Sequence, residues 1–258
     1  MKNFPKSIVF ITGTFIGNNC WDEWKLYFDD KGYNCMAPAW PNKDASPEVL
    51  RNRHPDPAIA SNRLEDLTDY FADIVSSLPE KPIVIGHSLG GLIVQLLLQR
   101  DLAAAGVALH SFPPGCAGVA KLSLIKTMWR AMGLFSSVDE SYMMSFKKWR
   151  RVVTNGMTCD EQKKLFYEYA TPESKLIIRD ALKATAKVNF ENKNVPLLLI
   201  SGSRDKLVSA SFNFDSYKKY KVSDSITDLK DFNGRNHLVF GHPAWREAAD
   251  FIHYWLQG

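Results

Sequence analysis

Ser88, Asp205 and His237 are the residues of this chain whose types and order suit nucleophilic catalysis. A serine hydroxyl is a weak nucleophile near neutral pH, so it needs a base such as histidine within hydrogen-bonding reach. An acidic residue then holds the imidazole in the right tautomer and stabilises its protonated form. These three side chains would attack a carbonyl carbon and form a covalent acyl intermediate.

The strongest local pattern surrounds Ser88, in the sequence GHSLGG at residues 86–91. The apolar run 82–85 before it predicts a buried strand, and the amphipathic stretch 92–102 after it predicts a helix. A sharp turn from strand to helix crowds the backbone, and glycine two positions before and two positions after the serine avoids a collision. The pattern predicts a nucleophile elbow that exposes the Ser88 hydroxyl at the edge of a sheet.

Asp205 and His237 each come after an apolar run, so both are expected on loops at the same sheet edge as Ser88. Asp205 follows the run 197–201, and His237 follows the weaker run 226–232. Aspartate is also common in turns and helix caps, which is the alternative role for Asp205. His242, five residues beyond His237, is the alternative base.

Short runs of Val, Ile and Leu predict the strands of a parallel sheet at residues 8–12, 33–37, 83–86, 107–111, 195–201 and, more weakly, 226–232. Helical patterns fall between them at residues 21–31, 59–78, 89–104 and 245–256. Such alternation predicts an α/β fold with helices on both faces of the sheet. The polar, proline-bearing segment 41–57 is expected to be a long loop.

Residues 115–190 interrupt this alternation, because they show helical patterns and no strand pattern. We expect them to form a helical lid over a core domain made of residues 1–114 and 191–258. The segment holds 13 lysines and arginines against seven acidic residues. Its basic cluster 147–151 could contact an acidic substrate, a membrane surface or nucleic acid, but a solvated helix face is the simpler interpretation.

Composition narrows the class of protein. The 258 residues are 45% hydrophobic and carry a net charge of +4, as expected of one globular domain. No run approaches the ~18 apolar residues of a membrane span, and no module for nucleic-acid binding is recognisable. The four cysteines are scattered without zinc-site spacing, which predicts neither a metal site nor disulfides and favours reduced thiols in the cytoplasm.

These motifs resemble the α/β-hydrolase superfamily, in its lid-bearing, esterase-like branch. The resemblance covers nearly the whole chain and is carried by the elbow 86–91, the acid loop 202–208 and the histidine loop 237–245. The order Ser, Asp, His along the chain is the order that this fold uses. The resemblance implies that Ser88 is the nucleophile, Asp205 the acid and His237 the base, and that no cofactor or metal is needed.

A fourth motif, Thr12-Gly13-Thr14-Phe15 with Trp21 downstream, is similar to the loop after the family's first core strand. Family members commonly read His-Gly here, and Thr12 replaces that histidine. The resemblance implies an oxyanion hole made by the backbone N–H groups of Thr14 and Leu89, where each donor is worth about 3 kcal/mol.

The expected substrate is an ester or lactone of moderate size with an apolar portion, because the lid is rich in aromatic and methionine side chains. Much of this set must form the lid's own core. The residues expected to contact substrate are Phe15, His87, Ser111, Met128, Trp129, Met132 and Trp149. For His87 the alternative is packing, and for Ser111 it is a buried hydroxyl bonded to backbone.

The fold also hosts other chemistry, so further functions stay open. Acyl transfer or cyclisation, lyase chemistry, cofactor-free oxygenation and ligand binding by a receptor are the alternatives to ester hydrolysis. The expected partner is the small-molecule substrate. The chain could also pair with a second copy of itself to form a homodimer.

Overall fold

The computed structural model describes residues 5–115, 118–182, 188–190, 195–222, 226–241 and 244–258. Within these residues, six strands form one parallel sheet in the order β2-β1-β3-β4-β5-β6. The strands are β1 (Ser7–Ile11), β2 (Asn34–Met36), β3 (Ile83–His87), β4 (Ala105–Leu109), β5 (Leu197–Gly202) and β6 (Thr227–Phe232). The predicted α/β fold with a parallel sheet is therefore confirmed.

Burial explains why these runs form strands. Every residue of β3, β4 and β5 is buried, as is all of β1 after Ser7, whereas the edge strands β2 and β6 are partly exposed. Parallel strands covered on both faces read as continuous apolar runs, and the central strands have that pattern. The weaker pattern at 226–232 belongs to an edge strand.

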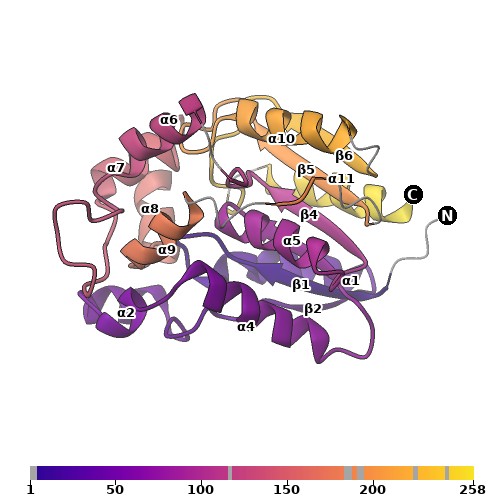
Figure 1. Ribbon diagram of the computed structural model, residues 1–258, viewed down its shortest axis with the longest axis horizontal. Helices are drawn as coiled ribbons and strands as arrows, with labels where there is room; N and C mark the ends of the chain where they lie inside the picture. Colours follow the sequence, from indigo (N-terminus) through magenta and orange to yellow (C-terminus); the bar gives the residue numbers. More distant parts are fainter. Residues whose placement is uncertain (1–4, 116–117, 183–187, 191–194, 223–225, 242–243) are drawn as a thin grey trace.

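Helices cover both faces of the sheet (Figure 1). On one face α1 packs against α11, and on the other α4 packs against α5. The helices of this framework are α1 (Asp22–Asp30), α2 (Pro47–Arg53), α3 (Pro57–Ala60), α4 (Leu64–Ser76), α5 (Leu89–Gln99), α10 (Ala210–Val222) and α11 (Trp245–Gln257), with a 3-10 turn, η1, at Asn18–Trp21.

Residues between β4 and β5 contribute the helices α6 (Gly118–Met128), α7 (Phe146–Val152), α8 (Cys159–Tyr169) and α9 (Lys175–Ala181). They gather at one end of the sheet (Figure 1). This segment is tied to the loop after β1 by backbone hydrogen bonds from Thr171 N–H to the Phe15 oxygen and from Gly17 N–H to the Tyr169 oxygen, both 2.9 Å. It therefore lies against the carboxyl end of β1.

The strand order reverses between β1 and β3, because the chain goes from β1 outward to β2 and then returns to the other side of β1. In open parallel sheets, ligands bind in the crevice at the carboxyl ends of the strands where the order reverses. Thr14 follows β1 and Ser88 follows β3, so both residues flank this crevice.

Two expected elements differ from the structure. The segment 41–57 contains helix α2, which starts with Pro47 after the Ser46 side chain caps the Val49 N–H. The expected helix 59–78 is two helices, α3 and α4. Between them the Ser174 hydroxyl contacts the carbonyl oxygens of Ala60 and Asn62 at 2.9 and 2.8 Å, a tertiary contact that no local pattern reveals.

Some sequence predictions lie outside the described residues. They include His242, the alternative base, together with Pro243 and Cys116. Among the helices that are described, none combines the length and hydropathy needed to cross a bilayer.

Candidate active site

Ser88 sits in a tight turn between a strand and a helix, as its sequence context predicts, but the prediction that its hydroxyl is exposed is wrong, because the residue is buried under the apolar side chains around it. Its φ and ψ are 56° and −115°. This backbone conformation is energetically costly for residues other than glycine, and such strained residues are frequent at functional sites. The turn is held by hydrogen bonds from Ser88 N–H to the Leu109 oxygen at 2.9 Å, and from Gly91 and Phe112 N–H to the Ser88 oxygen at 3.0 and 2.9 Å. The serine is thus fixed between β3, β4 and α5.

Glycines allow this turn to form. A Cβ atom on Gly86 would lie 2.2 Å from the Gly90 carbonyl oxygen, and one on Gly90 would lie 2.2 Å from the Ile11 oxygen. On the neighbouring loop, a Cβ on Gly13 would lie 2.8 Å from the Ser88 Cβ. The crowding predicted from the spacing of Gly86 and Gly90 is therefore present, and it brings the end of β1 against the turn.

Asp205 and His237 form a buried hydrogen bond, 2.7 Å from His237 Nδ1 to Asp205 Oδ2. The other carboxylate oxygen accepts hydrogen bonds from the Leu207 and Val208 N–H groups, both at 2.8 Å. Burial raises the pKa of Asp205, but the neighbouring His237 and His110 outweigh it and hold that pKa well below its usual range. Asp205 is therefore a carboxylate at neutral pH.

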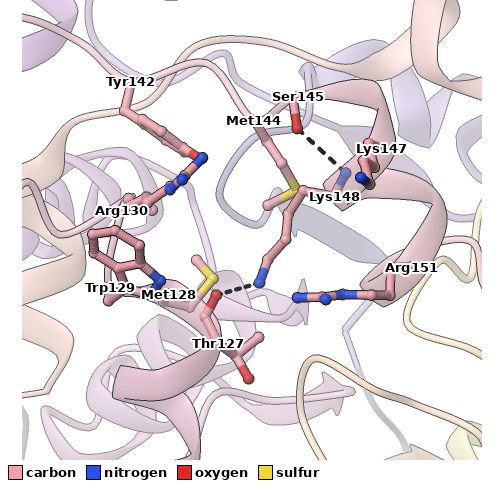
Figure 2. Close-up of a pocket in the computed structure, with 11 residues that line it drawn as sticks. Thr127, Met128, Trp129, Arg130, Tyr142, Met144, Ser145, Lys147, Lys148 and Arg151 are labelled. Carbon is pink, nitrogen blue, oxygen red and sulfur yellow. Dashed lines mark hydrogen bonds between the residues drawn. The ribbon is translucent and has the colours of Figure 1, made fainter.

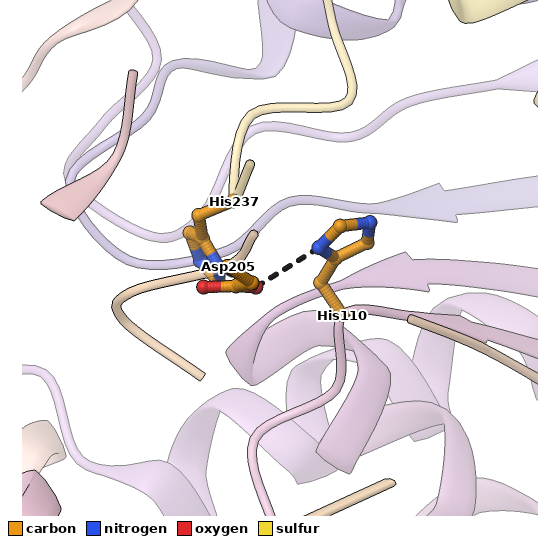
Figure 3. Close-up of side chains that lie close together, drawn as sticks. All are labelled: His110, Asp205 and His237. Carbon is orange, nitrogen blue, oxygen red and sulfur yellow. Dashed lines mark hydrogen bonds and ion pairs between the residues drawn. The ribbon is translucent and has the colours of Figure 1, made fainter. Parts of the chain in front are cut away.

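His110 is a second imidazole on the same carboxylate, and the sequence pattern did not reveal it. Its Nδ1 lies 2.9 Å from Asp205 Oδ2 (Figure 3). His110 follows β4 with φ of +48°, a conformation uncommon for residues other than glycine. A Cβ on Gly202 would lie 2.6 Å from the His110 ring, so the glycine that begins the acid loop makes room for it.

His87 connects the serine turn to the histidine loop rather than facing a cavity. Its Nε2 donates a hydrogen bond to the His237 carbonyl oxygen at 2.8 Å. The rings of His87 and His237 have centroids 4.8 Å apart. Burial, followed by the charges of His237 and His110, lowers the pKa of His87 well below its usual value. His87 is therefore neutral and acts as a fixed donor.

The loop after β1 is held by side chains on two sides. The Thr12 hydroxyl, at the position where the resemblance leads one to expect histidine, accepts a hydrogen bond from Trp21 Nε1 at 3.2 Å. Phe15, with φ of +66°, donates its N–H to Glu173 Oε2 at 3.2 Å. Glu173 is fully buried and pairs with Lys43 at 2.9 Å. Thr14 therefore lies in a loop braced from both the core and the helical segment.

A small cavity of about 10 Å³ contains Ser88 and both residues expected to form the oxyanion hole. This volume is about that of one water molecule. The cavity is lined by Thr14, Ser88, Leu89, Phe112, Leu124, Met128, Ile178, Ala181, Leu207 and Val208. The lining side chains are almost all apolar, and four of the lining residues belong to α6 and α9.

The other residues expected to contact substrate lie in different surroundings. Met128 lines the cavity, and Trp129 is 42% exposed beside it in the chain. Phe15, His87, Ser111, Met132 and Trp149 are buried and are not among the lining residues. The Ser111 hydroxyl accepts from Gln95 at 2.9 Å and donates to the Phe112 oxygen at 3.1 Å, which is the alternative role considered for it.

The group His110, Asp205 and His237 also has the composition of a metal site, with ligand atoms within 4.8 Å of one another. Both imidazole Nδ1 atoms, however, already lie at hydrogen-bonding distance from the single oxygen Asp205 Oδ2. The donors of the two rings and the acceptor oxygen thus satisfy each other directly, and hydrogen bonding accounts for the cluster.

The sequence comparison agrees with this geometry. The model of the alpha/beta hydrolase family matches residues 8–249, which is most of the chain. This chain belongs to the alpha/beta hydrolase family. A sequence search of curated proteins found no significant match.

Solved structures of other alpha/beta hydrolases share the fold at low sequence identity. A monoacylglycerol lipase from Paleococcus ferrophilus is 19% identical, with a TM-score of 0.65 over 98% of this chain and 95% of the lipase. A methylesterase from Arabidopsis is 16% identical, with a TM-score of 0.69 over 98% of this chain and 99% of the methylesterase. A pyrethroid hydrolase from Sphingobium faniae is 18% identical, with a TM-score of 0.68 over 98% of both chains.

Proposed function

We propose that this protein is a serine hydrolase that cleaves carboxylic esters or lactones with an apolar portion. The observation that carries the proposal is the buried Asp205–His237 hydrogen bond, tied through His87 to the strained turn that presents Ser88. The proteins of similar structure include a lipase, a methylesterase and a pyrethroid hydrolase, which supports ester cleavage as the reaction.

The proposed mechanism has two halves. Ser88 attacks the ester carbonyl while His237 Nε2 takes its proton, and His237 then gives that proton to the leaving alcohol. Water, activated by His237 in the same way, attacks the acyl-enzyme and releases the acid. Asp205 holds the His237 Nδ1–H and stabilises the imidazolium.

The oxyanion of each tetrahedral intermediate would be bound by the N–H groups of Thr14 and Leu89. Both residues line the same cavity as Ser88, and Leu89 is the first residue of α5, where backbone N–H groups are free to bind an anion. An apolar cavity strengthens such hydrogen bonds, because water does not compete for them.

We also propose that residues 115–190 act as a lid. Leu124, Met128, Ile178 and Ala181 of this segment roof the cavity, and the present volume has room for about one water molecule. An ester must therefore displace this roof to reach Ser88. A cytoplasmic location and a homodimer remain predictions from the sequence.

Hydrolysis of p-nitrophenyl esters from acetate to decanoate by the wild type and by Ser88→Ala tests the function. The wild type should release p-nitrophenol, and the variant should lose at least about a thousandfold in kcat. A folded wild type that hydrolyses none of the esters would contradict the proposal. That result would favour acyl transfer, lyase or oxygenase chemistry, and tight ligand binding without turnover would favour a receptor.

A further inference from the structure

A second, larger pocket lies beside the Ser88 cavity. It has a volume of about 310 Å³ and is formed by the end of α6, the following turn and α7 (Figure 2). Its lining residues are Thr127, Met128, Trp129, Arg130, Ala131, Tyr142, Met144, Ser145, Lys147, Lys148 and Arg151. Met128 lines this pocket and the Ser88 cavity alike, so the two spaces share a wall residue.

The charged residues that line this pocket are all positive. Four of the lining residues are cationic and none is acidic: Arg130, Lys147, Lys148 and Arg151. None of the four makes an ion pair with an acidic side chain in the part of the chain that the structure describes. Elsewhere cations of this protein do pair, as Lys43 does with Glu173 and Arg63 with Asp180. The pocket therefore has an uncompensated positive potential.

Lys148 is the least exposed of these four cations. Its ammonium group is half-buried and donates a hydrogen bond to the Thr127 carbonyl oxygen, and the Arg151 guanidinium points toward it (Figure 2). Burial lowers the pKa of Lys148, and Arg151 and Arg130 lower it further. An anion bound among these groups would balance their charge and accept charge-assisted hydrogen bonds from them.

The basic cluster 147–151 is thus more than a solvated helix face. Trp149 packs inward against Phe166, and Arg150 turns away to Gln162, with 2.7 Å between its Nε and the amide oxygen. The remaining three cations of the cluster line the pocket. Because the cluster lies on a helix, its residues face different directions: Trp149 is buried, Arg150 contacts Gln162, and the other three line the pocket.

Two buried methionines, Met128 and Met144, are among the residues that line the pocket. Methionine adapts to irregular apolar shapes. A ligand that reaches from Ser88 past Met128 would therefore lay an apolar chain on these side chains and end among the four cations. Such a ligand has a reactive carbonyl at one end and a negative charge at the other.

We propose that this cationic pocket binds the anionic end of the substrate, which is an ester with an apolar acyl chain that ends in a carboxylate. The inference rests on the proposed ester hydrolysis and specifies its substrate class. Lys148 and Arg151 supply the charge-assisted hydrogen bonds, and Met128 contacts the chain. The bond broken is the ester bond at Ser88, and the distant carboxylate takes no part in the chemistry.

The test uses two p-nitrophenyl esters of suberic acid that differ only at the far end, one with a free carboxylate and one with a methyl ester. Release of p-nitrophenol reports cleavage at the same bond in both. The wild type should prefer the carboxylate by at least about tenfold in kcat/KM, and Lys148→Gln with Arg151→Gln should abolish this preference. High salt should reduce it in the wild type.

Lys126→Gln is the matched control, because Lys126 is an exposed residue of α6 that does not line the pocket. It should keep the preference of the wild type. Equal kcat/KM for the two esters in the wild type, or an unchanged preference in the double variant, would overturn the proposal. Thermal unfolding of each variant establishes that it is folded.

A binding measurement separates this proposal from the proposed hydrolysis. Calorimetry with monomethyl suberate and the Ser88→Ala protein requires no turnover. Binding that weakens at least tenfold in the Lys148→Gln, Arg151→Gln background supports the anion site even if no ester is hydrolysed. Hydrolysis of both esters at equal rates, without such binding, leaves the hydrolase and removes the anion site.

Discussion

Asp205 accepts four hydrogen bonds, and two of them come from different imidazoles. His237 is the partner that the chain order predicts. His110 has no such signal, because histidine after a strand is unremarkable and its contact depends on how β4 and β5 lie side by side. Its left-handed backbone and the glycine opposite it are visible only in the folded chain.

We expect His110 to position Asp205 and thereby His237. His110→Phe keeps a ring in the space but removes the donor, so kcat should fall by about tenfold with little change in KM. His110→Asn should restore much of the activity, because asparagine donates a hydrogen bond and tolerates positive φ. Steady-state kinetics on one p-nitrophenyl ester measures both. Equal losses in the two variants would indicate a purely steric role.

His87 should make the folded protein sensitive to mild acid. Its pKa is lowered well below the usual 6.5 by burial and by His237 and His110, so below about pH 6.5 the unfolded chain binds a proton that the folded chain does not. The free energy of unfolding therefore falls as the pH drops below that value, by at most about 1.4 kcal/mol per pH unit for this group.

The variant His87→Gln removes this titration while its amide can still donate to the His237 oxygen. Urea unfolding at pH 7.5, 6.0 and 5.0 should show a smaller loss of stability for the variant than for the wild type. The other histidines are present in both proteins, so the difference between the two pH dependences reports the titration of His87 together with its coupling to His237 and His110. Parallel pH dependences would show that His87 is not the group responsible.

At the scale of elements, apolar runs identify the central strands because those strands are buried on both faces. The boundaries differ where tertiary contacts decide them, as at the break between α3 and α4. The buried pair of Lys43 and Glu173 is also invisible in the sequence, since its members are 130 residues apart and each reads as a surface residue. It joins the segment 41–57, the loop after β1 and the start of α9.

Glu173→Gln should destabilise the protein by about 3 kcal/mol, because it leaves the Lys43 ammonium buried without its counter-ion. The double variant Lys43→Met, Glu173→Gln should recover part of that loss, since no unpaired charge remains. Chemical denaturation measures all three proteins. Asp215→Asn, which breaks the exposed Asp215–Lys218 pair, is the control and should change stability little. A Glu173→Gln loss as small as that of the control would contradict the buried-charge argument.

At the scale of the whole molecule, the crossover of strand order places the ends of β1 and β3 together, and the segment between β4 and β5 is hydrogen-bonded to the loop after β1. Sequence patterns do not reveal the two spaces that residues of this segment line. One is a cavity of about 10 Å³ at Ser88 and the other a cationic pocket of about 310 Å³. That Met128 lines both spaces depends on packing, which sequence periodicity does not report.

Met128 is therefore expected to set the acyl-chain length that the enzyme accepts. Met128→Ala removes the wall shared by the cavity and the pocket, so kcat/KM for decanoate should rise by at least about fivefold relative to acetate as the apolar chain gains space. Met132→Ala is the matched control, because Met132 is buried nearby but does not line the Ser88 cavity or the cationic pocket. Both variants should lose about 2–5 kcal/mol of stability by truncation in a packed interior, so stability alone does not distinguish them. The profile of activity against p-nitrophenyl ester chain length does distinguish them. A shift toward long chains that occurs in Met128→Ala and not in Met132→Ala would place Met128 in the path of the acyl chain. Equal profiles in the two variants would assign Met128 to packing.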